Sequence, residues 1–138
     1  MSRSIPDKLR LLVAERAGFA CEYCLVGQDD LIFSCQVDHI ISLKHGGKTV
    51  AENLACSCLP CNVSKGSDVG SIVSSQGKFT RFFNPRRDNW SDHFSLSDGI
   101  ILPKSLIGEA TVRIFQFNAP ERVLRRRLLA TAGRYPGR

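Results

Sequence analysis

The sequence predicts an α+β fold in which a short hairpin and a helix surround a four-cysteine metal site. Two pairs, Cys21-x2-Cys24 and Cys58-x2-Cys61, have the spacing of metal-binding knuckles. The 33 residues between the pairs exceed the roughly 15–20 of a compact zinc ribbon, so a folded segment must fill the interval. Apolar residues at helical spacing precede and follow this core. Together these observations predict the fold class.

Structural zinc is the predicted occupant of the four cysteines. Four thiolates suit a tetrahedral Zn²⁺, and a two-residue gap lets both sulfurs of a knuckle turn toward one ion. Disulfides are the competing use of paired cysteines. The start MSRSIPDKLR shows no apolar signal-peptide core, and the chain has no apolar run of membrane length. We therefore expect a cytoplasmic protein without a membrane partner, and in a reducing compartment the pattern favours metal.

Two further cysteines lie close to the predicted site. Cys56 competes with Cys58 as a ligand, but Cys58-x2-Cys61 repeats the spacing of the first pair and is preferred. Cys35 lies in an apolar run and is expected to be a small buried hydrophobic residue.

The chain length of 138 residues predicts a single domain. Within it we expect an N-terminal helix in residues 1–18, a zinc-bound core in residues 19–68 and a mixed α/β extension in residues 79–130. The Ser- and Gly-rich stretch at residues 69–78 is expected to be a flexible connection between core and extension. The tail at residues 131–138 is expected to fray.

The interval between the cysteine pairs predicts a hairpin that runs into a helix. Leu31–Val37 is apolar and partly β-branched, which indicates a strand. Ile40–Leu43 is expected to be the returning strand or a loop, and Gly46-Gly47 marks a turn. A short helix is expected to start at Asn62 and to end at Gly66.

Polar residues in this interval match the needs of phosphodiester hydrolysis. That reaction requires a nucleophilic water, a base, and a cation that neutralises charge on the phosphate and the leaving oxygen. His39, with an ordinary pKa of about 6.5, can be the base. Asp38 and Asn62 offer the hard oxygen ligands that Mg²⁺ or Mn²⁺ prefers. Asn53 can bond the backbone of the His39 loop, and Lys65 can place a charge on a neighbouring phosphate.

Four stretches of this region resemble the zinc-framed HNH endonuclease family: C-E-Y-C, V-D-H-I-I-S-L-K-H-G-G, E-N-L-A-C-S-C and C-N-V-S-K-G. The resemblance covers about Phe19 to Gly66, a third of the chain, and implies a treble-clef-like ββα-metal core. The 13-residue interval from His39 to Asn53 and the eight-residue interval from Asn53 to Asn62 are similar to those in the HNH domain of RNA-guided DNA nucleases.

The resemblance implies a role for each matched residue. His39 would be the general base, and Asn53 would orient the loop that carries it. Asn62 stands where the final His of the motif often falls, and it would bind the catalytic Mg²⁺ or Mn²⁺ together with Asp38. The implied activity is metal-dependent hydrolysis of DNA to 3′-hydroxyl and 5′-phosphate ends.

The segments before and after the zinc-bound core also contain predicted helices and a strand. The N-terminal helix is expected to end at Gly18 and to pack on the core. In the extension, residues 99–102 predict a strand. Residues 108–118 fit either a helix or a strand, and the helix is favoured. A second helix is expected at residues 120–130. Its predicted buried side consists of Val123, Leu124 and Leu128.

The extension is basic and aromatic, and its F-N-P-R and W-S-D-H-F stretches resemble an extension found in some bacterial HNH proteins. Its arginines have two interpretations: they contact DNA phosphates, or they cover a small hydrophobic core. The pair Asp92-His93 lacks a cysteine frame and is expected to be structural. The candidate phosphate contacts are Lys65, Arg81, Arg86 and Arg87, followed by the segment 122–127.

Charge agrees with a DNA partner. The net charge is +6 and the pI about 9.2, which suits a polyanion. Two other classes also fit part of the pattern. An inactive zinc-ribbon nucleic-acid-binding module predicts binding without cleavage. A protein-interaction zinc module predicts no salt-dependent affinity for DNA.

Overall fold

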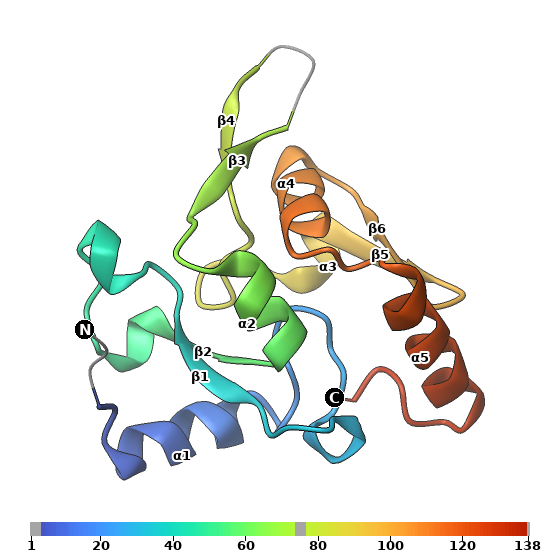
Figure 1. The fold of residues 1–138 in the computed structure, drawn as a ribbon, viewed down its shortest axis with the longest axis horizontal. Helices are drawn as coiled ribbons and strands as arrows, with labels where there is room; N and C mark the ends of the chain where they lie inside the picture. The colour runs from blue at the N-terminus through green and yellow to red at the C-terminus, as the bar shows by residue number, and fades with distance from the viewer. Residues whose placement is uncertain (1–3, 74–76, 138) are drawn as a thin grey trace.

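The computed structural model describes residues 4–73 and 77–137 (Figure 1). The helices and strands follow one another in the order α1(Asp7–Arg16), β1(Gln36–His39), β2(Leu54–Ser57), α2(Leu59–Lys65), β3(Gly70–Ile72), β4(Phe79–Arg81), α3(Trp90–His93), β5(Phe94–Ser97), β6(Ile100–Pro103), α4(Leu106–Ile114) and α5(Pro120–Thr131). Three two-stranded antiparallel sheets are formed, each from strands that are neighbours in sequence. The α+β class predicted from the sequence agrees with this mixture.

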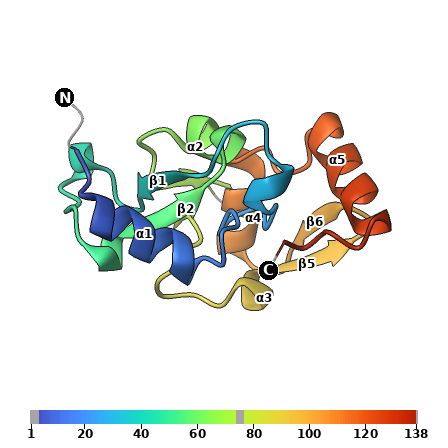
Figure 2. The ribbon, with the colours of Figure 1, turned by 90° about the horizontal axis from the view of Figure 1, so that it is seen from below.

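A hairpin and a helix form the centre of the core. In the hairpin Asp38 lies opposite Ala55, and His39 lies opposite Leu54. α2 follows β2 directly and packs against β1. The hairpin lies between α1 and α2 in both views (Figures 1 and 2). The order strand, strand, helix is consistent with the expected ββα core.

The first strand lies later than the predicted Leu31–Val37. β1 begins at Gln36, and the residues before it bend. Its partner β2 ends at Ser57, because Cys58 turns the chain into α2, so the residues before Gln36 have no strand beside them. Ile40–Leu43 leaves the hairpin as a loop, and β2 is the returning strand.

The helix that follows starts earlier than predicted and ends where predicted. α2 begins at Leu59 rather than at Asn62, with Pro60 in its first turn, where a missing N–H costs nothing. It ends at Lys65, and Gly66 follows with a φ of 55°. Helix α2 therefore carries Cys61, Asn62 and Lys65 on one rigid element.

The predicted N-terminal helix is present as α1 and packs on β2. Val13 is fully buried against the hairpin, in a cluster with Leu54 and Cys56. Arg16 donates from Nη2 to the Leu54 carbonyl at 2.8 Å. Gly18 follows the helix with a φ of 65°, a conformation that favours glycine.

The extension joins the core through one aromatic cluster. Tyr23 of the first knuckle contacts the rings of Phe83 and Phe115, and Phe115 contacts Phe82 and Phe117. All five rings are buried together with the four cysteines of the predicted site. Residues of the first knuckle and of the extension therefore share one interior.

Three elements of the extension were predicted, whereas the short elements β4, α3 and β5 were not. The predicted strand at residues 99–102 corresponds to β6, and its partner β5 was missed. The predicted helix at residues 108–118 corresponds to α4. The stretch expected to be flexible contains β3, which pairs with β4 in a hairpin that projects from the body of the molecule (Figure 1). Residues 74–76 of that stretch lie outside the described residues.

The buried side predicted for α5 is wrong. The helix forms at Pro120–Thr131, but Leu124 and Leu128 are 54% and 63% exposed, and the buried residue is Arg126. The Arg126 guanidinium donates to the carbonyls of Gly99 and Phe117, both at 2.7 Å. These carbonyls lie in the connections between elements, so the docking surface for α5 is polar and selects an arginine.

The prediction that the tail frays is also wrong for residues 131–137. After α5 the chain returns to the first knuckle (Figure 1). The Tyr135 hydroxyl donates to the Cys24 carbonyl at 2.7 Å, and Gly137 N donates to the Leu25 carbonyl at 2.8 Å. Arg134 and Asp30 form an ion pair at 2.5 Å. The tail therefore braces the segment that carries the first cysteine pair.

We predict that the tail contributes to global stability. Tyr135→Phe leaves the Cys24 carbonyl without this donor and is expected to lower the free energy of unfolding by about 1 kcal/mol. Tyr135→Ala also removes the packed ring and is expected to cost about 3 kcal/mol or more. Urea denaturation of the two variants measures both effects. Equal stability of wild type and both variants would show that the tail is not docked in solution.

Candidate active site and metal centre

Four cysteines converge at one point between the first knuckle and α2. The sulfur atoms of Cys21, Cys24, Cys58 and Cys61 all lie within 4.8 Å of one another, and all four residues are buried. Cys24 Sγ and Cys58 Sγ are 3.6 Å apart. Tetrahedral Zn²⁺ with Zn–S bonds of about 2.3 Å separates its sulfurs by about 3.8 Å. The cluster therefore has the size and chemistry of a four-thiolate metal site, as predicted.

Arg122 of α5 lies against this cluster. Its Nη2 donates to Cys61 Sγ at 3.0 Å, and its Nη1 donates to the Phe115 carbonyl at 2.6 Å. Burial opposes the charged form, but the thiolates of Cys61 and Cys24 raise the pKa of Arg122 above its ordinary value. A divalent ion with four thiolates has a net charge of −2, so this guanidinium compensates charge at the metal centre.

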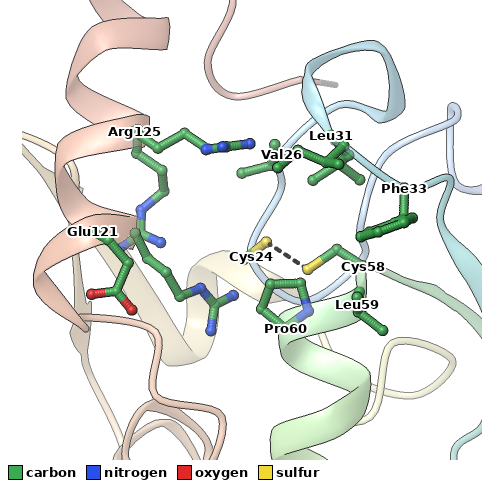
Figure 3. Close-up of a pocket in the computed structure, with 12 residues that line it drawn as sticks. Cys24, Val26, Leu31, Phe33, Cys58, Leu59, Pro60, Glu121 and Arg125 are labelled. Carbon is green, nitrogen blue, oxygen red and sulfur yellow. Dashed lines mark hydrogen bonds between the residues drawn. The ribbon is translucent and has the colours of Figure 1, made fainter.

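A cavity of about 310 Å³ separates α5 from the cysteine cluster (Figure 3). Cys24 and Cys58 lie in its wall, with Arg125 on the side of α5 and Leu31 and Phe33 on the opposite side. Arg125 Nη1 crosses toward that side and donates to the Asp30 carbonyl at 3.1 Å. Helix α5 is therefore tied to Cys61 through Arg122 and to Asp30 through Arg125.

Cys35 and Cys56 lie outside the four-sulfur cluster. The two thiols share a hydrogen bond, which is the main cause of a raised pKa at Cys35 and a lowered one at Cys56. Cys56 is buried in β2 opposite Val37, so it does not replace Cys58. Cys35 is half-buried and packs against both parts of the core, close to the predicted small hydrophobic role.

Asp38 and Lys65 form an ion pair between β1 and α2. Lys65 Nζ lies 2.9 Å from Asp38 Oδ2 and also donates to the His39 carbonyl at 2.9 Å. Burial raises the pKa of Asp38, and the charge of Lys65 opposes that shift. Asp38 Oδ2 is buried and makes no well-aligned hydrogen bond with the described residues. The carboxylate thus has a buried oxygen that pairs with a cation.

His39 lies at the end of β1 with its ring held from the following loop. Its Nε2 is 2.9 Å from the Thr49 hydroxyl. The backbone N–H of Ile40 donates to the Asn53 carbonyl at 2.8 Å, which fixes the chain directly after the histidine. The ring and the backbone of His39 are therefore positioned by two separate parts of one loop.

Asn53 closes that loop with its side chain. Its Oδ1 accepts from Ile41 N, and its Nδ2 donates to the carbonyls of Ile41 and Lys48, each at 2.9 Å. Gly47 lies so close that an added Cβ would fall 1.7 Å from the Ile41 carbonyl oxygen and 2.8 Å from Asn53 Nδ2. The amide thus occupies a closely packed position and bonds three backbone groups of the loop.

Asn62 lies one helical turn before Lys65 on α2, and both side chains face β1. Its Nδ2 donates to the side-chain oxygen of Gln36. Gln36 and Asp38 are two residues apart on β1 and so share a face of the strand. The structure therefore brings Asn62 to the face of β1 that carries Asp38.

Three of the four predicted phosphate contacts have internal partners. Lys65 is 2% exposed and pairs with Asp38. Arg81 forms a two-bond pair with Asp88 at 2.8 and 3.0 Å. Arg86 pairs with the buried Glu22, whose other oxygen accepts from Cys56 N at 2.8 Å. Arg87 is exposed and makes no ion pair with the described residues. The alternative interpretation, that arginines of the extension cover its interior, fits Arg86 and also Arg122.

In the second Asp-His pair, Asp92-His93, the histidine contacts residues that hold the fold together. His93 Nδ1 lies 2.6 Å from the hydroxyl of Ser105, which also caps α4 by accepting from Gly108 N. The His93 ring packs against the edge of Phe83.

Sequence reasoning missed three residues of the site. Thr49 lies in an ordinary K-T-V run and carries no signal. Arg122 is one of several arginines, and only the position of α5 singles it out. Glu22 was detectable in principle, since an acid inside a cysteine knuckle and a basic F-N-P-R-R stretch are complementary.

This geometry defines a small α+β protein in which a four-cysteine cluster that could bind a metal lies beside a strand–strand–helix unit. Residues 21–68 match the family model of HNH endonuclease. The resemblance seen in the sequence is confirmed over this region, and it supports a nuclease or nucleic-acid-binding function. Comparisons with curated proteins and with solved structures gave no match. Among the described residues, no helix is long and apolar enough to cross a membrane.

We predict that Arg122 strengthens metal retention at the four cysteines. Arg122→Met keeps an aliphatic stem but removes the N–H···S bond and the compensating charge, and it is expected to weaken zinc affinity about tenfold or more. Competition with a chelating dye measures this change. Arg127→Met is the matched control, because Arg127 lies on the same helix and contacts Asp98 instead. Equal zinc affinity of the two variants would remove the role assigned to Arg122.

Proposed function

We propose that this protein is a metal-dependent HNH endonuclease that hydrolyses phosphodiester bonds in DNA. Structural Zn²⁺ at the four cysteines holds the first knuckle and α2 together and takes no part in the reaction. The proposed general base is His39, and Asn53 orients its loop. A reducing compartment such as the cytoplasm suits this arrangement, because the four thiols must stay reduced to bind the metal.

The proposed catalytic ion is Mg²⁺ or Mn²⁺, held by Asp38 and Asn62. The fit rests on a buried carboxylate oxygen without a well-aligned hydrogen bond, Asp38 Oδ2, and on an amide brought to the same face of β1. Carboxylate and amide oxygens are the donors that these ions prefer. When bound, the ion supplies positive charge to the scissile phosphate and to the leaving oxygen.

Other residues of the chain have separate proposed roles in the reaction. His39 accepts a proton from the attacking water at its imidazole. Thr49, hydrogen-bonded to Nε2, sets the plane of the ring, and Asn53 prevents the backbone on either side of the loop from moving. Lys65 holds the β1 end against α2 through the His39 carbonyl and keeps positive charge beside Asp38. The observation that carries the proposal is the three-bond Asn53 clamp beside a histidine and a carboxylate, within a region that matches the HNH family.

We predict that His39 is essential for cleavage and dispensable for folding. Pure protein is incubated with supercoiled plasmid in Mg²⁺, in Mn²⁺ and in EDTA. Metal-dependent nicking by the wild type is expected. His39→Ala is expected to lower the nicking rate by about 100-fold or more, because general-base catalysis typically contributes that factor or more.

The control for that experiment is His45→Ala, an exposed histidine of the same loop, compared at saturating DNA. Zinc content and thermal unfolding check that both variants are folded. Full activity of His39→Ala would refute the assignment of the base. DNA binding without cleavage under any divalent ion would favour the inactive nucleic-acid-binding module.

We predict that Thr49 acts as a positioning residue through its hydroxyl. Thr49→Val keeps the shape of the side chain but loses the bond to His39 Nε2, and kcat is expected to fall about tenfold with little change in KM. Thr49→Ser retains a hydroxyl and is expected to recover most of kcat. If valine and serine variants have equal kcat, the hydroxyl does not orient the histidine.

A further inference from the structure

Three of the four cations that the sequence indicates as DNA contacts are already paired within the protein. Lys65, Arg81 and Arg86 each have an acidic partner within the protein, as described above. Each of these pairs already neutralises its cation and fixes its direction. A DNA phosphate would have to compete with Asp38, Asp88 or Glu22 for them, and in the case of Glu22 the acid is almost completely buried.

Two other lysines have no acidic partner among the described residues. Lys44 and Lys48 are exposed, and neither makes an ion pair or side-chain hydrogen bond with the described residues. Both lie on the loop between Ile41 and Asn53 that positions His39. Lys48 directly precedes Thr49, whose hydroxyl is 2.9 Å from His39 Nε2.

A tight turn and a hydrogen bond fix the backbone of this loop at Lys44 and at Lys48. Lys44 lies in a single 3-10 turn, Leu43–His45, which Gly46 ends in the left-handed conformation with a φ of 85°. The carbonyl of Lys48 accepts from Asn53 Nδ2 at 2.9 Å. The loop is also tied to the residues after α2, because the Ser42 hydroxyl donates to the Ser67 carbonyl at 3.1 Å. The backbone that carries both charges is therefore fixed relative to the catalytic residues before any ligand arrives.

We propose that Lys44 and Lys48 form the phosphate-contacting surface that sets the DNA strand in register with His39. This inference rests on the proposed nuclease function and adds the residues that hold its substrate. Exposed lysines bind phosphates as point charges without sequence preference. A preorganised loop adds little ordering cost on binding. The contacted phosphates are those next to the scissile one, because the loop and the histidine share the Thr49 contact.

The test is the salt dependence of DNA binding in EDTA, where cleavage does not occur. Fluorescence anisotropy with a labelled duplex gives the affinity at several salt concentrations. In Lys44→Gln/Lys48→Gln the slope of log K against log salt is expected to fall in magnitude by about 1.8, since each lost phosphate contact removes about 0.9. Lys44→Arg/Lys48→Arg is expected to keep the wild-type slope.

The matched control is Lys8→Gln/Arg113→Gln, which removes the same charge from α1 and α4. Both residues are exposed and make no side-chain hydrogen bond or ion pair with the described residues. A control that lowers the slope as much as the lysine pair does would overturn the inference, because it would show a general charge effect. If the wild type shows no salt-dependent binding, the proposed function itself fails. If the wild type binds and the lysine pair changes nothing, only the lysine surface fails.

Discussion

Four sulfur atoms from two segments of the chain, residues 21–24 and 58–61, must share a space less than 5 Å across, and most of the structure follows from that requirement. The second pair can reach the first only if the chain between them returns as a hairpin. Helix α2 must then start immediately after β2, so that Cys58 and Cys61 face the knuckle. A metal-bound cluster of four thiolates also has excess negative charge in a buried place, which is costly unless a cation lies close.

The C-terminal extension supplies that cation and closes the cluster from solvent. Arg122 reaches Cys61 Sγ, and Arg126 holds α5 in position by bonding carbonyls of two connections. The tail then returns to the carbonyls of the first knuckle through Tyr135 and Gly137. These contacts account for part of the basic character of the extension. The positive charges of Arg122 and Arg126 make their contacts within the protein.

The sequence predicted the centre of the protein better than its connections. Cysteine spacing is a direct geometric signal, and the four cysteines do converge. The resemblance to the HNH family is the source of the proposed roles of Asp38, His39, Asn53 and Asn62. The start of β1 was misplaced because apolar character marks burial, whereas strand length depends on how far the partner strand extends. The buried side of α5 was misjudged because periodicity assumes an apolar partner, and here the partner is a set of carbonyl and thiolate acceptors. Side-chain pairing has no local signal, so Arg86 with Glu22 and Thr49 with His39 appear only in three dimensions.

Helix α2 shows how the metal centre and the candidate active site constrain each other. Cys61 and Lys65 are four residues apart, so they lie on the same face of the helix, and both are buried. Cys61 fixes that face to the sulfur cluster, and Lys65 fixes it to Asp38 and to the His39 carbonyl. A short helix held at two such points cannot rotate about its axis without breaking one of them. Asn62 is carried between the two anchors, so its direction toward β1 is set by contacts that other residues make. Loss of metal from the cysteines would therefore release Asn62 as well as the knuckle, although Asn62 is not part of the sulfur cluster.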